Sequence, residues 1–340
     1  MVVISQNPVD NVIIGVIAIV FLVFVADKVI GKLIKLGKKF GISQIFIGLT
    51  VIAVGTSLPE ITTGVVASLD IVSGNIDSFI ASGTVLGTNI GSDIVQQSLI
   101  IGIVGLLAVT HLGAIHVRRD FLKTDGLVMI MAAILLLLFA LDKEISRAEG
   151  AVLFFGYIFF LWFLWMKEDE RIHNHKKVEL NWNDKKNIFI DLFYILAGLV
   201  IIIFSAEYIL RITEFFVIRY EIGSSLIGIL AIGIATALPE LTASITAILK
   251  GASSISLGTL IGSNITNPMF ALGLGAMISS YQVPRPVIVY DIPVKIVSGL
   301  ILMWFLWTNK IFTKKEAMTM ITIYLVYVLV RLRYFPVDII

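Results

Sequence analysis

Two similar stretches lie far apart in the chain: "AVGTSLPE" at residues 53–60 and "GIATALPE" at residues 233–240. Each places a glutamate directly after a proline, in the middle of a long apolar segment. Membrane helices rarely carry an acid, and an acid that they do carry is functional by default. The repetition therefore predicts one functional site that is built from two related segments.

The composition indicates a membrane protein. The chain has 340 residues, of which 58% are hydrophobic and 15% charged, and its mean hydropathy is +0.97. Soluble domains are roughly 45–50% apolar. The net charge of +2 is too small to indicate nucleic-acid binding, and the lack of cysteine excludes disulfides and thiolate chemistry. Long, numerous apolar segments predict a polytopic protein of the cell membrane.

We predict an all-α fold with ten transmembrane helices, each near the ~20 residues that cross a bilayer. Runs such as "GLVMIMAAILLLLFAL" do not alternate as the strands of a β-barrel do. The predicted spans are 11–31, 43–69, 78–108, 124–141, 149–167, 188–210, 224–249, 254–280, 287–308 and 316–335.

Lys and Arg are distributed unevenly between the predicted loops. Eighteen of the 26 fall in loops that follow the odd-numbered spans, and seven fall on the other side. Basic loops face the cytoplasm. We therefore predict a cytoplasmic central loop and extracellular termini.

The two halves of the chain resemble one another beyond the opening motif. Residues 24–30 align with 204–210, and 47–60 with 227–240, both at an offset of 180. "GTVLGTNIGS" at 83–92 aligns with "GTLIGSNITN" at 258–267, and "KTDGLVM" at 123–129 with "VYDIPVK" at 289–295. Five spans per half is an odd number, so the second half must be inverted, as in many transporters. We predict a first five-helix repeat (1–167), a cytoplasmic linker (168–187) and a second repeat (188–340).

The repeated motif offers oxygen ligands. Its proline removes a backbone hydrogen bond and loosens the helix, so nearby carbonyl groups can turn toward a cavity. Thr56 and Glu60 lie four residues apart and share a helix face, as do Thr236 and Glu240. Carboxylate, hydroxyl and carbonyl oxygens suit Ca²⁺ and Na⁺, whereas Zn²⁺ and Cu⁺ prefer nitrogen or sulfur.

The next helix of each half carries a matching polar stripe, Thr88 with Ser92 and Ser263 with Asn267. Its glycines allow a neighbouring helix to approach closely. Such hydroxyls can also simply join helices. Nearer the span ends, we interpret Asp125 and Asp291 as interfacial or capping, and the spacing of Asp291 and Lys295 predicts an ion pair.

The motifs "GTSLPE" with "GTNI" and "ATALPE" with "GSNI" resemble the alpha-repeats of the sodium/calcium exchangers, in the cation/calcium antiporter superfamily. The likeness covers nearly the whole chain and is greatest to the compact prokaryotic type. It implies Ca²⁺/Na⁺ antiport by alternating access, with helices 1 and 6 sliding across the other eight. It also implies that the site takes transported ions and no cofactor. The ligands implied are the backbone oxygens of Ala53 and Gly233 and the side chains of Thr56, Ser57, Glu60, Thr88, Thr236, Glu240 and Ser263, with Ser92 and Asn267 at adjoining ligand positions.

Three residues depart from the family pattern. Ala237 replaces a hydroxyl residue, Ser92 stands where Asn is usual, and Asn267 stands where Asp is usual. With Glu60 and Glu240 as the only acids of the cavity, we expect a Ca²⁺ site with reduced Na⁺ sites. Fewer Na⁺ per Ca²⁺, or substitution of Na⁺ by H⁺, would follow.

Three other functions are weighed against this one. A Ca²⁺/H⁺ exchanger of the same superfamily usually carries "GNA-x-E" in place of "GTSLPE". A cation channel needs a continuous pore, which an inverted repeat does not favour. An enzyme is not expected, because no H-E-x-x-H or nucleophile motif is present. The partners expected are Ca²⁺, Na⁺ or H⁺ and membrane lipid, with no nucleic acid and no obligate protein partner, so that the chain is a monomer.

Overall fold

The computed structural model describes residues 7–39, 50, 52–112, 115–116, 122–172, 182–249, 251, 253–308 and 311–339. Within these residues the chain is mostly helical, with two short strand pairs. The predicted span 43–69 is described only in part, because residues 43–49 and 51 lie outside. The same holds for residues 173–181 of the predicted linker.

The elements of the first half run from α1 to α9. They are α1 (Pro8–Lys39), α3 (Ala53–Thr56), α4 (Leu58–Val72), α5 (Ser78–Ile94), η2 (Val95–Ile100), α6 (Ile101–Leu112), β1 (Ile115–His116), η3 (Leu122–Gly126), α8 (Leu127–Ala140), β2 (Glu144–Ile145) and α9 (Arg147–Ile172).

The second half contains the remaining elements. They are α10 (Trp182–Tyr220), α11 (Ser224–Ile227), η4 (Gly228–Ile232), α12 (Gly233–Thr236), α13 (Leu238–Leu249), α14 (Ser253–Thr266), η5 (Asn267–Ala271), α15 (Leu272–Ser279), β3 (Tyr281–Gln282), η6 (Val287–Asp291), α16 (Ile292–Thr308), β4 (Ile311–Phe312) and α17 (Lys314–Tyr334). The η segments are π-helical turns that continue directly into α-helices.

Six helical stretches of the described chain are long and apolar enough to cross a membrane. They are Ser78–Thr110, Leu122–Ala140, Arg147–Met166, Ser224–Leu249, Val287–Thr308 and Lys314–Tyr334. Each corresponds to a predicted span. The predicted spans 11–31 and 188–210 lie within α1 and α10, where Pro8–Phe21 and Phe189–Gly198 form shorter apolar stretches.

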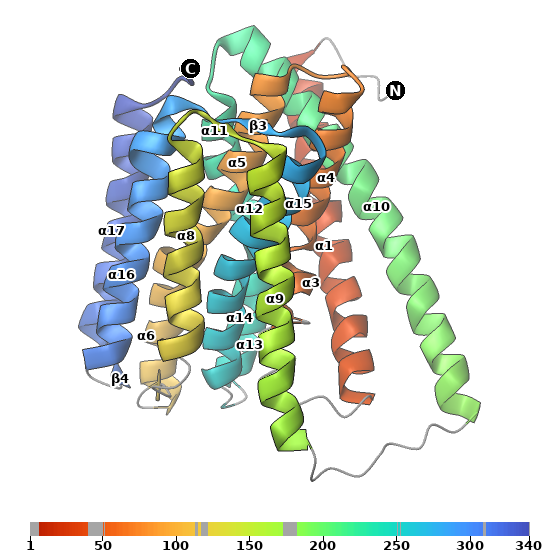
Figure 1. Cartoon of the computed structure of the whole chain (residues 1–340), viewed down its shortest axis with the longest axis vertical. Coiled ribbons are helices and arrows are strands. Elements are labelled where there is room, and N and C mark those ends of the chain that lie inside the picture. The colour runs from red at the N-terminus through yellow and green to blue at the C-terminus, as the bar shows by residue number, and fades with distance from the viewer. Residues whose placement is uncertain are drawn as a thin grey trace.

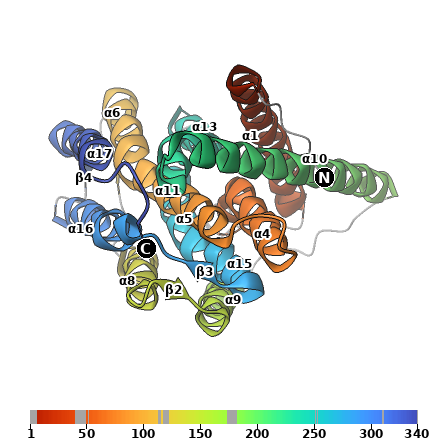
Figure 2. The same cartoon turned by 90° about the horizontal axis from the view of Figure 1, so that it is seen from above.

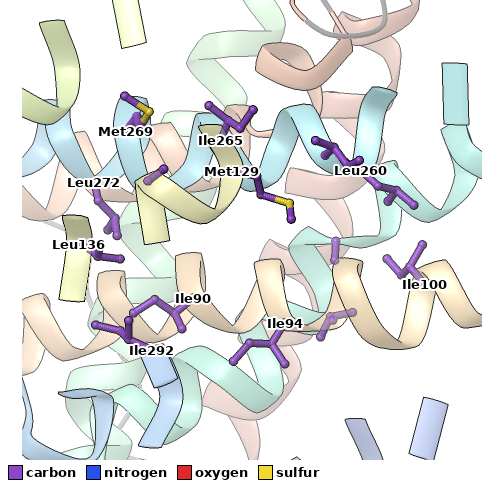
Figure 3. Packing of buried hydrophobic residues seen from close by; sticks show 14 of the residues in the cluster. Ile90, Ile94, Ile100, Met129, Leu136, Leu260, Ile265, Met269, Leu272 and Ile292 are labelled. Carbon is purple, nitrogen blue, oxygen red and sulfur yellow. The ribbon is translucent and has the colours of Figure 1, made fainter. Parts of the chain in front are cut away.

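The arrangement places α5 near the middle of the bundle. Seen from above, α8 and α9 lie on one side of α5, and α1 and α10 lie on the other (Figure 2). Buried apolar side chains of α5 and η2 pack toward α14 and α15, with Met129 and Leu136 of α8 and Ile292 of α16 beside them (Figure 3). Of the six membrane-length stretches, Ser78–Thr110, which carries the first polar stripe, has the largest buried share.

α1 and α10 pack chiefly against each other (Figure 1). Lys32 of α1 and Asp191 of α10 form an ion pair at 2.7 Å, which joins the two helices. The start of α1 and the end of α17 lie at the same end of the bundle (Figure 1).

The two strand pairs connect the halves reciprocally. β2, between α8 and α9, pairs with β3, which follows α15. β1, which follows α6, pairs with β4, between α16 and α17. The two pairs lie at opposite ends of the bundle, with β3 near the top and β4 near the bottom of Figure 1.

Close helix crossings bring the halves together at the motifs. A Cβ atom added at Gly91 of α5 would lie 2.6 Å from the Cα of Ile229, and one at Gly233 would lie 2.9 Å from the backbone nitrogen of Ser92. Real Cβ contacts are almost never this short, so both positions need glycine for the crossing of α5 with η4 and α12. Gly87, within the "GTVLG" motif, is equally confined, because a Cβ atom there would lie closer still to the carbonyl oxygen of Ser225. This confirms the expected close approach for the motif of the first half.

Candidate functional site

The two motif glutamates lie at matching interruptions of their helices. The helix is interrupted at Ser57, between α3 and α4, and at Ala237, between α12 and α13. The proline follows in the first turn of the new helix in each case. Glu60 and Glu240 are fully buried, and no carboxyl oxygen of either has a hydrogen-bond partner among the described residues. A buried acid without partners is costly unless a bound cation or proton compensates it.

Each glutamate faces one hydroxyl group from its own half and one from the other half. The carboxyl group of Glu240 lies close to the hydroxyls of Thr56 and Ser263, whose oxygens are 3.2 Å apart, and to the carboxyl group of Glu60. The carboxyl group of Glu60 lies close to Ser92 and to Thr236. The structure thus brings the two predicted half-sites together into one.

The threonine hydroxyls are oriented by the backbone. Thr56 donates to the carbonyl oxygen of Ala53 at 3.2 Å, Thr236 to that of Gly233 at 3.3 Å, and Thr88 to that of Thr84 at 2.8 Å. A hydroxyl that donates its proton to a carbonyl group keeps its oxygen lone pairs for another partner. These oxygens therefore remain available to a cation.

The two predicted carbonyl ligands are already used by the helices. The oxygen of Ala53 also accepts from the backbone nitrogen of Ser57 at 3.1 Å, and that of Gly233 from Ala237 at 3.2 Å. Each carbonyl oxygen thus accepts two hydrogen bonds. A cation at either oxygen would compete with them, so we expect these to be weaker ligands than the carboxylates.

The halves differ at the helix interruption. Ser57 is fully buried, and its hydroxyl oxygen has no hydrogen-bond partner among the described residues. Ala237 occupies the corresponding place and is equally buried. The first half therefore offers one more oxygen than the second.

An acid that the motifs did not indicate lies beside the site. Asp93 is fully buried, follows Ser92 directly and is near enough to Glu60 for their charges to repel. Its carboxylate accepts a hydrogen bond from Asn267 at 2.8 Å and forms an ion pair with Lys295. The expectation that Glu60 and Glu240 are the only acids of the cavity is therefore wrong. The available signal was a lysine inside a predicted span, which needs a buried partner.

The predicted pair of Asp291 with Lys295 is also wrong. Asp291 pairs with Arg331 at 3.1 Å and accepts a hydrogen bond from Tyr327 at 2.9 Å. Asp291 is fully buried, and Asp125 is only 5% exposed. Arg331, one of the seven basic residues on the side opposite the predicted cytoplasmic loops, is buried as well. The i, i+4 spacing permits a pair within one helix, but residues from other helices, Asp93 and Arg331, are the actual partners of Lys295 and Asp291.

Buried amides complete the polar region. Gln96 of η2 donates to the Ser92 hydroxyl at 3.0 Å and accepts from Asn264 at 3.1 Å. Asn89 and Asn264 each donate to the carbonyl oxygen four residues earlier, at 2.9 Å. The π-helical turn η2 thus places Gln96 against the candidate ligand Ser92. The hydrogen bond between them fixes the orientation of the Ser92 hydroxyl.

The ligand set fits a hard cation. No group of three or more His, Cys, Asp or Glu suited to a metal occurs within the described residues, so carboxylates alone do not make the site. Two carboxylates with several hydroxyl oxygens match the oxygen coordination of Ca²⁺ and its tolerance of irregular geometry. A sulfur- or imidazole-preferring metal finds no suitable donors among these residues.

The sequence model of the family described as sodium/calcium exchanger protein matches residues 11–166 and 190–333. The chain belongs to this family. The matched regions include both Leu-Pro-Glu motifs and both polar stripes. The family consists of membrane transporters.

Known proteins resemble the chain over most of its length. The sodium/calcium exchanger MaX1 of Methanosarcina acetivorans is 29% identical over 94% of this chain and 98% of its own. The putative antiporter CaxA of Alkalimonas amylolytica is 30% identical over 77% of this chain and 79% of its own. A solved structure of the sodium-calcium exchanger NCX_Mj, soaked with Na⁺ and Sr²⁺, has a TM-score of 0.64 and 22% identity, covering 95% of this chain and 99% of that one. The chain therefore has a fold similar to that of NCX_Mj.

Proposed function

We propose that the chain exchanges Ca²⁺ for Na⁺ across the cell membrane by alternating access. The observation that carries this proposal is the pair of fully buried carboxyl groups of Glu60 and Glu240, which lie close together at two helix interruptions with no hydrogen-bond partner among the described residues. Two carboxylates balance the charge of one Ca²⁺ or of two Na⁺. Both ions would therefore bind the same site in turn.

The proposed ligands are the two glutamates and the oxygens that the motifs and the family resemblance imply. They are the side chains of Thr56, Ser57, Glu60, Thr88, Ser92, Thr236, Glu240, Ser263 and Asn267 and the backbone oxygens of Ala53 and Gly233. Glu60 and Glu240 hold Ca²⁺, and the hydroxyls complete its shell.

The proposed architecture is ten transmembrane helices in two inverted repeats, 1–167 and 188–340, which a cytoplasmic linker joins. The reciprocal strand pairs support it, because each half contributes one strand to either end of the bundle. The location of the start of α1 and the end of α17 at one end supports termini on the same side (Figure 1). We propose that this side is extracellular and that the chain acts as a monomer.

Access alternates when α1 and α10 move together over the rest of the bundle. Their mutual packing and the ion pair of Lys32 with Asp191 support movement as one unit. An uncompensated charge at the membrane centre is costly. α1 and α10 therefore change position only when bound cations neutralise both glutamates.

The direct test is ⁴⁵Ca²⁺ uptake into proteoliposomes under imposed gradients. Internal Na⁺ should drive uptake, and an equal proton gradient without Na⁺ should not. The Glu316→Gln variant is the matched control, because Glu316 is a buried acid that caps α17 through Thr313. It should transport normally. Uptake driven by protons alone would replace this function with Ca²⁺/H⁺ exchange, and passive flux without a counter-ion would indicate a channel.

A further inference from the structure

A fully buried ion pair between α5 and α16 lies at membrane depth. Lys295 and Asp93 are each about 1% exposed, and the lysine ammonium contacts the carboxylate. Lys295 is the ninth residue of the 22-residue stretch Val287–Thr308, about 12 Å from its first residue at 1.5 Å per residue. A charge at this depth persists only with a compensating partner.

The pair is joined to the proposed ion site. Asp93 follows Ser92 in α5 and accepts a hydrogen bond from the side chain of Asn267 at 2.8 Å. Its carboxylate is also close enough to repel that of Glu60. Without Lys295, Asp93 would be a third negative charge beside the two motif glutamates.

Both members of the pair break the internal symmetry of the chain. The alignment of 83–92 with 258–267, continued by one residue, pairs Asp93 with Pro268, and the alignment of 123–129 with 289–295 pairs Lys295 with Met129. Met129 is as well buried as Lys295, so the first half fills the equivalent place with an uncharged side chain. The repeated fold therefore does not require a charge at either position.

We propose that Lys295 is a built-in cation of the transport site. The inference rests on the proposed exchange function. The ammonium neutralises Asp93, so that only Glu60 and Glu240 remain for transported cations. Lys295 touches no transported ion and is a positioning residue: it determines how many positive charges the site accepts.

The rival explanation is a purely structural connection between α5 and α16. Other bonds already make this connection. Gln97 of η2 donates to the carbonyl oxygen of Lys295 and to the hydroxyl of Ser298, both at 2.6 Å. The helices thus stay joined when the ammonium is removed, and variants at Lys295 are expected to fold.

The test is a charge cycle of Lys295→Met, Asp93→Asn and the double variant, in full-length protein purified in detergent and in proteoliposomes. Asp93→Asn leaves an uncompensated positive charge beside the site, so Ca²⁺ affinity should fall at least about tenfold. The double variant should return to within about threefold of wild type. Lys295→Met should carry one more positive charge per Ca²⁺ than wild type, measured from the voltage at which net Ca²⁺ flux vanishes.

The matched control is the double variant Asp291→Asn with Arg331→Met. It removes the other fully buried ion pair of the described chain, one helical turn from Lys295 and bonded to Tyr327 and Ser225. It should lower thermal stability and leave Ca²⁺ affinity unchanged.

Three results would overturn the proposal: equal affinity in all four proteins of the cycle, a double variant as weak as Asp93→Asn, or unchanged charge transport in Lys295→Met. If Asp93→Asn does not fold, the other two variants decide. Failure of exchange itself would appear separately, as wild-type Ca²⁺ flux that does not respond to Na⁺.

Discussion

The two copies of the Leu-Pro-Glu motif are alike in their fold and unlike in the oxygens they supply. Each copy interrupts a helix, buries a glutamate and directs a threonine hydroxyl to the carbonyl oxygen three residues earlier. The first copy adds the buried hydroxyl of Ser57, whereas the second has Ala237. The comparison shows that the shared residues build the site and that the residues differing between copies adjust its capacity.

The largest effect is expected when the glutamate of one copy is replaced while the other is kept. Glu60→Gln and Glu240→Gln should each reduce ⁴⁵Ca²⁺ flux by about a thousandfold, because one unit charge near 4 Å contributes roughly 4 kcal/mol at an effective dielectric constant of 20. Size-exclusion profiles and melting temperatures must show that both variants fold. A variant that kept more than a few per cent of the flux would mean that the two copies are not equivalent.

The hydroxyls that cross between the halves should matter less. Ser263→Ala removes the hydroxyl that lies 3.2 Å from that of Thr56, and Thr236→Val removes a hydroxyl beside Glu60. Each should weaken Ca²⁺ binding about fivefold to thirtyfold, on the order of 1–2 kcal/mol for a lost polar contact. Calorimetric titration measures the change. Thr322→Val is the control, since its exposed hydroxyl donates within its own helix.

The difference between Ser57 and Ala237 predicts the Na⁺ requirement. Ala237→Ser should add a Na⁺ ligand and steepen the Na⁺ dependence of Ca²⁺ flux, and Ser57→Ala should make that dependence shallower. In wild type, charge balance at Glu60 and Glu240 predicts exchange of two Na⁺ per Ca²⁺. The ion gradients at which net Ca²⁺ flux is zero should then not depend on the membrane potential. A third Na⁺ would add one net charge per cycle and shift that balance by about 2.3 kcal/mol per 100 mV. Such movement in wild type would refute the reduced stoichiometry.

The smallest effect is expected at Tyr281, which lies outside the proposed ligand set. Tyr281 of β3 bonds to the Ser68 hydroxyl at 2.7 Å and to the carbonyl oxygen of Gly64 at 3.0 Å. Tyr281→Phe should lower stability by about 1 kcal/mol, because the Ser68 hydroxyl keeps its bond to the carbonyl oxygen of Gly275. Thermal unfolding should detect the loss while Ca²⁺ affinity stays unchanged. A change in affinity would mean that this strand end is coupled to the site.

Sequence reasoning predicted the elements better than it predicted their partners. Apolar length located the helices, and the proline located their interruptions at Ser57 and Ala237. Spacing along one helix gave the shared face of Thr56 and Glu60. It also suggested Asp291 as the partner of Lys295, and there it failed. The actual partner, Asp93, lies 202 residues earlier in the chain, and a choice between helices depends on packing that periodicity does not encode.

The most direct measurement for a single shared site is the number of Ca²⁺ ions bound per chain. Equilibrium dialysis with ⁴⁵Ca²⁺ should give one ion per chain in wild type and none in either Glu60→Gln or Glu240→Gln at the same free Ca²⁺. Added Na⁺ should displace the bound ion from wild type. Two ions per wild-type chain, with one retained by each variant, would mean that the halves bind Ca²⁺ independently and would contradict the account.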